Sequence, residues 1–152
     1  MPQIYLDHNS TTPLDPLVFE SMLPYFTLKF GNPSSVHQLG QIAYSALDKA
    51  RSQLSALLHC QPDEIIFTNG GTESDNLAIQ GIARSLLSKG NHIVTSQIEH
   101  TAVLNTCKFL ETLGYQITYL PADENGLVDP QDVKKALTKK TILISIMFAN
   151  NE

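Results

Sequence analysis

Apolar residues recur along most of the chain at helical or strand spacing, and the two spacings alternate. Between residues 36 and 58 they return every three or four positions, which predicts a long amphipathic helix. Short runs rich in β-branched and aromatic residues predict strands at 64–68, 92–96, 115–120 and 141–148. Helical patterns occupy about 72–88, 101–113 and 130–138. This alternation over short connections predicts an α/β fold, a mainly parallel sheet with helices on both faces.

The two ends of the pattern carry further expectations. Asp15 before Pro16 predicts a helix start, and Pro24 is expected to end that helix because proline cannot donate a backbone hydrogen bond. The run 141–148 is apolar on both faces, which is typical of a central strand covered by helices on both sides. The sequence stops soon afterwards, and such a strand would leave apolar surface and a bare edge. We therefore expect a fragment of a longer protein.

Composition narrows the class of protein. The 152 residues, 42% of them hydrophobic, suffice for one domain whose core needs no disulfide or metal. Lys and Arg number 10 against 15 Asp and Glu, so the chain is acidic and nucleic acid is a poor partner. No secretory leader pattern and no membrane-spanning apolar stretch occur, which predicts no membrane association. Cys60 and Cys107 form neither a disulfide framework nor a zinc motif, and a reducing cytoplasm fits best.

The connection 68–76 is the first place where chemistry is expected. Ligands of parallel sheets bind at the carboxyl ends of the strands, and here Gly70 and Gly71 precede a helix that begins near Thr72. Free N–H groups and the positive end of the helix dipole would suit a phosphate. Alternatively, Thr72 and Asp75 would form a capping box, and both interpretations stay open. The phosphate-loop and dinucleotide patterns of glycines are absent, which disfavours ATP and dinucleotides.

Two more connections end at the same edge of the predicted sheet. His100 opens the helix 101–113, where an imidazole could stack on a planar ring, move a proton, or simply begin the helix. Asn150 and Asn151 follow the last strand, where their amides could orient a polar ring substituent or make a turn. Cys107 shares a helical face with apolar residues, which predicts a buried structural thiol.

Five segments in order resemble consecutive motifs of the cysteine desulfurases, in the bacterial group that serves iron–sulfur cluster assembly and includes the nitrogen-fixation desulfurase. They are YLDHNSTTP (5–13), GNPSSVH (31–37), NGGTESDNLA (69–78), EHTAV (99–103) and ANNE (149–152). The resemblance implies a pyridoxal 5′-phosphate enzyme of the aspartate-aminotransferase type (fold type I). It implies that residues 15–152 are the N-terminal part of the large cofactor-binding domain and that residues 1–14 reach the substrate side.

The resemblance also implies roles for individual residues. Gly71 and Thr72 would bind the cofactor phosphate, His100 would stack on the pyridine ring and transfer protons, and Asn151 would approach the ring's phenolic oxygen. The implied reaction takes sulfur from L-cysteine and leaves L-alanine and an enzyme persulfide. The implied enzyme is a cytoplasmic homodimer that passes sulfur to an iron–sulfur scaffold or another acceptor.

The family's reactive residues have no counterpart in this sequence. No lysine stands in the Ser-x-His-Lys context of the family's Schiff-base lysine, and neither cysteine matches the position of its nucleophile. The chain alone is therefore expected to be inactive. A related pyridoxal phosphate enzyme such as a selenocysteine lyase, or a non-catalytic truncated remnant, stays open as an alternative. The sulfur acceptor, and a role in nitrogen fixation or in housekeeping assembly, also stay open.

Overall fold

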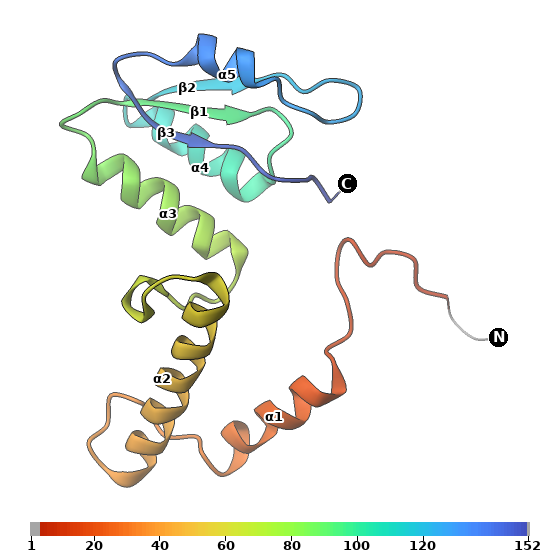
Figure 1. Cartoon of the computed structure of the whole chain (residues 1–152), viewed down its shortest axis with the longest axis vertical. Coiled ribbons are helices and arrows are strands. Elements are labelled where there is room, and N and C mark those ends of the chain that lie inside the picture. Colours follow the sequence, from red (N-terminus) through yellow and green to blue (C-terminus); the bar gives the residue numbers. More distant parts are fainter. Residues whose placement is uncertain (1–3, 152) are drawn as a thin grey trace. The chain divides into compact units, whose positions relative to one another are not determined.

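A computed structural model describes residues 4–151 of the chain. Two compact units meet in the sequence between Phe67 and Thr68, and each has its own internal contacts (Figure 1). The assignment of residues 1–14 to a substrate-side segment and of 15–152 to the large domain stays a prediction.

The first unit is helical. It contains α1 (Pro16–Thr27), α2 (Gln38–Leu58) and the short 3₁₀ helix η1 (Pro62–Glu64). The Asp15 side chain caps α1, as expected, by accepting a hydrogen bond of 2.8 Å from the Leu17 N–H. The expectation that Pro24 ends this helix is wrong. Proline lacks a donor but keeps its carbonyl, and that carbonyl accepts the N–H groups of Leu28 and Lys29 at 2.9 and 2.8 Å, so the last turn closes around it.

The strand expected at 64–68 does not form. After η1 the chain is extended, but within residues 4–151 it pairs with no strand. The Arg51 side chain on α2 donates a hydrogen bond to the Ile65 carbonyl, and its guanidinium carbon lies 5.0 Å from the centroid of the Phe67 ring. The segment that suggested a strand therefore contacts α2 through two of its residues: the Ile65 carbonyl accepts a hydrogen bond from Arg51, and the Phe67 ring packs against the Arg51 guanidinium.

The second unit is an α/β layer structure. Its elements are α3 (Gly71–Ser85), β1 (His92–Ser96), α4 (Thr101–Thr112), β2 (Gln116–Leu120), α5 (Pro130–Ala136) and β3 (Thr141–Ser145). The strands are parallel in the order β2-β1-β3, and a helix connects each to the next. In Figure 1, α5 lies on the opposite side of this sheet from α3 and α4. The predicted parallel sheet with helices on both faces is thus confirmed in this unit.

The central strand is β1 rather than the last one. Every residue of β1 is buried, because the strand has a partner on each side and helices over its faces. In contrast, β3 lies at the edge of the three strands, is only half-buried and ends at Ser145, short of the predicted 148. The backbone N–H of Met147 donates to the Glu99 side chain, 48 residues earlier in the sequence, and is therefore not available to pair with a neighbouring strand.

The core of this unit packs α3 and α4 against β1. Its buried members are Ile79, Ala83, Ile93, Val103, Cys107, Leu110 and Tyr115. Each fully buried aliphatic side chain of this kind contributes roughly 2 kcal/mol. The Tyr115 hydroxyl donates to the Ala83 carbonyl at 2.9 Å and so satisfies the polar end of a buried ring. The predicted burial of Cys107 is confirmed, and this core holds the starts of α3 and α4 at one edge.

His92, the first residue of β1, joins all three strands. Its ring nitrogens lie 2.7 Å (Nδ1) from the Thr141 hydroxyl of β3 and 2.9 Å (Nε2) from the Thr118 hydroxyl of β2. The imidazole is buried, and desolvation lowers its pKa below the usual value. Both hydroxyls can accept or donate, so they satisfy the neutral ring that burial favours.

Candidate functional site

The start of α3 is made of backbone rather than of capping side chains. Gly70, the residue before the helix, has φ +150° and ψ 177°, a conformation available essentially to glycine alone. No side chain caps this helix, and a recess of about 500 Å³ opens beside its first turn. The residues that line the recess are Asn69, Gly70, Gly71, Thr72, Glu73 and Asn76. The exposed N–H groups of a helix start, at the positive end of its dipole, suit an anion.

The alternative of a capping box at Thr72 does not occur. Thr72 is the second residue of α3, inside the helix, so its side chain is not in the N-cap position. The carboxylate nearest the start belongs to Glu73, whose Oε2 accepts hydrogen bonds from the backbone N–H of Asn69 at 2.7 Å and from its side-chain amide at 3.1 Å. This carboxylate is therefore hydrogen-bonded by Asn69, two residues before the helix, and the first-turn N–H groups keep no side-chain acceptor.

His100 begins α4. It is the N-cap residue, and its Nδ1 accepts the backbone N–H of Ala102 at 3.1 Å. A ring nitrogen that accepts a hydrogen bond carries no proton, so in the neutral imidazole the proton resides on Nε2. The side chain is exposed, and the cap fixes one edge of the ring while the other stays accessible. The helix-start interpretation of His100 is therefore correct in geometry, and it is compatible with a ligand at Nε2 or on the ring face.

Two hydrogen bonds join the turn before His100 to the segment after β3. Oε1 of Glu99, which is 7% exposed, accepts the Met147 backbone N–H at 2.6 Å and the Ser96 hydroxyl at 3.1 Å. The Asn150 side-chain amide donates to the Ile98 carbonyl at 2.6 Å. Sequence reasoning missed Glu99; the available signal was a carboxylate between an apolar strand and a histidine, where a buried charge needs donors.

The site residues predicted from the sequence lie at one edge of the second unit. Figure 1 shows the starts of α3 and α4 and the segment after β3 at the end toward which the strand arrows point. Gly71, Thr72 and His100 are thus brought to the carboxyl edge of the sheet. Asn151 follows the anchored Asn150 in an exposed segment without regular structure.

Residues 4–152 match the aminotransferase class-V family. The chain belongs to this family. It is 56% identical over 150 residues to a protein named cysteine desulfurase IscS from Dictyoglomus turgidum, covering 99% of this chain and 38% of the relative. It is 52% identical over 149 residues to a cysteine desulfurase IscS from Methanosarcina thermophila, with 98% of this chain and 37% of the relative covered. The chain therefore spans less than two fifths of the length of these class-V aminotransferase relatives.

Solved structures share the fold of this class-V aminotransferase chain. One described as a NifS-like protein has a TM-score of 0.95 at 38% identity and covers 99% of this chain and 42% of its own. Another, described as SspA in complex with cysteine, has a TM-score of 0.91 at 43% identity, over 97% of this chain and 43% of that one. The predicted resemblance to the cysteine desulfurases and the α/β fold class are both confirmed by these similarities.

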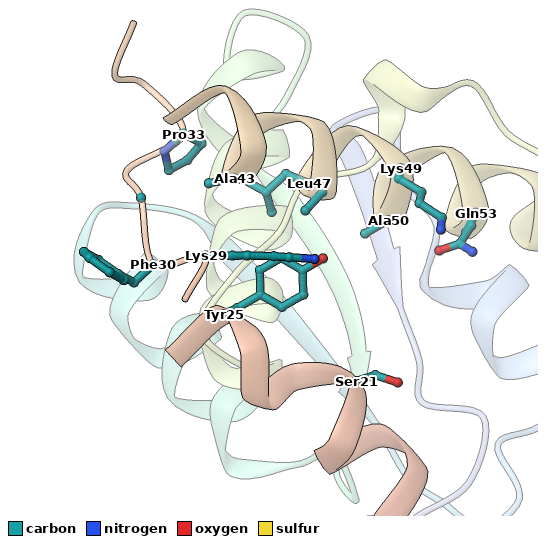
Figure 2. A pocket seen from close by; sticks show the side chains of 12 residues that line it. Ser21, Tyr25, Lys29, Phe30, Pro33, Ala43, Leu47, Lys49, Ala50 and Gln53 are labelled. Carbon is teal, nitrogen blue, oxygen red and sulfur yellow. The ribbon is translucent and has the colours of Figure 1, made fainter. Parts of the chain in front are cut away.

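The first unit of this class-V aminotransferase chain has a groove of its own. It measures about 680 Å³ and is lined by α1, α2 and the residues between them (Figure 2). The Lys29 ammonium lies 5.5 Å from the centroid of the Tyr25 ring, and Lys49 and Gln53 extend from α2 in Figure 2. None of the site residues predicted from the sequence lines this groove.

Two kinds of feature are absent from the residues that the structure describes. Within 4–151, no group of His, Cys, Asp and Glu side chains is arranged to hold a metal ion. No helix in the same range is both long and apolar enough to cross a bilayer.

Proposed function

We propose that this chain is the part of a pyridoxal 5′-phosphate-dependent cysteine desulfurase that holds the cofactor's phosphate and ring. The whole enzyme takes sulfur from L-cysteine, leaving L-alanine, and delivers the sulfur for iron–sulfur cluster assembly. The observation that carries the proposal is the uncapped glycine start of α3 at the same sheet edge as the N-cap His100, in a chain 56% identical to a cysteine desulfurase. The names of the relatives favour desulfurase over the selenocysteine lyase alternative.

The start of α3 fits the phosphate group. Gly71 and Thr72 present backbone N–H groups, and Thr72 adds a hydroxyl, at the positive end of a fifteen-residue helix. Gly70 opens this end because its φ of +150° excludes an ordinary side chain. Beyond the backbone of its own helix turn and its chain neighbours, no described heavy atom lies within 4 Å of where a Cβ on Gly71 would stand. The nearest carboxylate, on Glu73, is engaged by Asn69. A dianionic phosphate would thus meet donors without a competing side-chain acceptor.

His100 fits the ring of the cofactor. The Ala102 N–H holds Nδ1, so the plane of the imidazole is set by the first turn of α4. We assign to this ring two tasks: covering one face of the pyridine by stacking, and moving a proton through Nε2. When bound, pyridoxal phosphate supplies an electron sink for the substrate's α-carbon.

We assign to Asn151 the role of contacting the phenolic oxygen of the cofactor ring. Its side-chain amide can donate a hydrogen bond to that oxygen. The support for this assignment is that the preceding residue, Asn150, is tied to the Ile98 carbonyl, and Met147 to Glu99. These two bonds hold the segment after β3 against the turn that carries His100.

The sulfur-transfer chemistry needs groups that this chain does not offer. Burial first, then the charges of Glu111 and Glu99, raise the pKa of the Cys107 thiol to about 11, so it stays protonated and unreactive near neutral pH. We propose that the whole desulfurase is a cytoplasmic homodimer that passes sulfur to an iron–sulfur scaffold or another acceptor. The free thiols of Cys60 and Cys107 fit a reducing compartment. Within the whole desulfurase, residues 1–14 would reach the substrate side and residues 15–152 would begin the large domain.

The test is cofactor binding to the chain of residues 1–152. Pyridoxal 5′-phosphate and pyridoxal are titrated separately while the backbone amides of Gly71 and Thr72 are followed by NMR. We expect those amides to shift when pyridoxal phosphate is added. We expect pyridoxal phosphate to bind at least ~10-fold more tightly than pyridoxal, because hydrogen bonds to a charged group contribute about 1.5–3 kcal/mol. We expect no release of alanine from cysteine. Equal binding of the two compounds, or amide shifts confined to the first unit, would refute the proposal.

The matched variants change one threonine each. Thr72→Val removes a hydroxyl at the start of α3, and Thr112→Val removes one at the end of α4, where it donates to the Phe109 carbonyl of the same helix. We expect the first to weaken pyridoxal phosphate binding and the second to leave it unchanged. Loss of binding in both variants would mean that the effect is one of stability.

A further inference from the structure

Polar side chains on α3 form a ladder at four-residue intervals. The Arg84 guanidinium (Nη2) donates to Oε1 of Gln80 at 3.3 Å, and Nε2 of Gln80 donates to Oδ1 of Asn76 at 2.9 Å. Nδ2 of Asn76 then donates to the Thr72 carbonyl at 2.8 Å. Residues four apart share one face of a helix, so the ladder runs along one side of α3 to its start.

Arginine sets the direction of this ladder. A guanidinium has donors and no acceptor, so it requires the carbonyl oxygen of Gln80 to face it. The Gln80 amide group must then face Asn76, and the Asn76 amide group must face Thr72. The two side-chain amides are therefore held in one orientation each, and Oδ1 of Asn76 is left pointing toward the neighbouring helix.

Oδ1 of Asn76 also accepts a hydrogen bond from α4. The Thr106 hydroxyl lies 2.8 Å from this oxygen and 2.8 Å from the Ala102 carbonyl, so it shares its proton between the two helices. Thr106 is 3% exposed, which means that water does not compete for this hydroxyl. The N–H of Ala102, which belongs to the peptide group before the one that holds this carbonyl, donates to Nδ1 of His100. Thr72 and His100 are thus joined through Asn76, Thr106 and the backbone on either side of the Ala102 α-carbon.

We infer that Asn76 is a positioning residue that sets the spacing between the phosphate-binding start of α3 and the imidazole of His100. This inference rests on the proposed function, in which one ligand carries both a phosphate and a ring. Because the two groups are covalently linked, their spacing is fixed, and a protein that binds both must hold its own two contact points at a matching separation. A bond from the middle of α3 to the middle of α4 fulfils this requirement without touching the ligand's ring.

The decisive comparison uses two ligands that differ in how many contact points they occupy. Inorganic phosphate engages only the start of α3, whereas pyridoxal phosphate engages that start and His100. In Asn76→Ala and Thr106→Val we expect pyridoxal phosphate to bind about 3- to 10-fold more weakly, the effect of about one net hydrogen bond. Thr106 does not line the recess beside α3, so in Thr106→Val we expect phosphate binding to change less than about 2-fold. The double variant is expected to bind no more weakly than either single one, since both changes break the same link.

Two further variants separate positioning from stability. Thr106→Ser keeps the hydroxyl and is expected to restore binding. Asn91→Ala removes a different side-chain bond, 2.8 Å to the Gly114 carbonyl, and should lower stability without changing the ratio of the two affinities. An equal loss for phosphate and pyridoxal phosphate in Thr106→Val, no rescue by serine, or the same ratio change in Asn91→Ala would overturn the inference.

A measurement without ligand keeps this inference distinct from the proposed function. The ¹⁵N chemical shifts of the His100 ring report the hydrogen bond at Nδ1. We expect them to move in Asn76→Ala and Thr106→Val and to stay in place in Asn91→Ala. If the parent chain fails to prefer pyridoxal phosphate over pyridoxal, the proposed function fails. The ¹⁵N shifts of His100 then decide by themselves whether Asn76 positions this ring. If those shifts are the same in the variants as in the parent, the inference is rejected.

Discussion

Oε1 of Glu99 accepts the backbone N–H of Met147 at 2.6 Å, and this bond spans 48 residues of sequence. It joins the residue before His100 to the segment that leads from β3 to Asn151. The carboxylate is almost fully buried and also accepts the Ser96 hydroxyl, so two donors satisfy its charge. Two of the proposed cofactor contacts therefore depend on one buried acidic side chain that itself need not touch a ligand.

Glu99→Ala tests this connection. The change leaves the Met147 N–H and the Ser96 hydroxyl without their acceptor, and an unsatisfied buried donor costs about 1–3 kcal/mol. We expect the free energy of unfolding to fall by that amount in urea denaturation, and the Met147 amide to exchange with solvent much faster. The control is Glu124→Ala, in an exposed turn of the same unit. Equal effects of the two substitutions would contradict the role given to Glu99.

Gly70 and Gly81 provide a pair of alanine substitutions with opposite expected signs. Gly70 has φ +150°, so alanine there is strained and should destabilise the chain by about 1–3 kcal/mol. Gly81 lies inside α3 with no heavy atom within 4 Å of an added Cβ, so alanine should stabilise the helix by about 0.5–1 kcal/mol. Thermal denaturation of both variants checks the prediction. A Gly70→Ala chain as stable as the parent would mean that the start of α3 has another backbone conformation.

The lowered pKa of His92 predicts loss of stability in mild acid. Desolvation depresses the folded-state pKa below the ordinary 6.5, so the unfolded chain binds the proton more readily. The contribution of His92 is therefore complete above about pH 6.5 and declines as the pH falls toward the folded-state pKa. Urea denaturation at pH 7.5 and 5.5 measures the decline. In His92→Gln, whose amide does not titrate, the difference between the two pH values should shrink; an unchanged difference would assign it to other groups.

The regular elements were predictable because their signals are local. The three- and four-residue spacing of 36–58 and the Asp15–Pro16 start need only neighbours in sequence, and both correspond to helices in the structure. The failure at 64–68 has a different origin: those residues look like a strand, but no other strand within residues 4–151 pairs with them, and the Ile65 carbonyl accepts a hydrogen bond from Arg51 instead. A periodic pattern contains no information about which partner a strand will find.

The candidate site was only half predictable for the same reason. Gly71, Thr72 and His100 stand at helix starts, which the sequence marks with glycines and a polar residue after an apolar run. The groups that hold them are not marked. Asn76 meets Thr106 across 30 residues, and His92 meets Thr141 across 49. These polar pairs depend on which helix packs on which strand, and a single sequence does not specify that packing.

The reactivity of Cys107 tests whether this thiol could serve as a sulfur acceptor. The pKa raised from 9.0 to about 11 leaves roughly 100-fold less thiolate near neutral pH than an ordinary cysteine has, and the side chain is fully buried. In a Cys60→Ser chain we expect Ellman's reagent to label Cys107 only as fast as the protein unfolds, and in Cys107→Ser the half-exposed Cys60 should react without unfolding. Denaturant should make the two rates equal. Rapid native labelling of Cys107, or its conversion to a persulfide with cysteine and pyridoxal phosphate, would contradict its assignment as a structural residue.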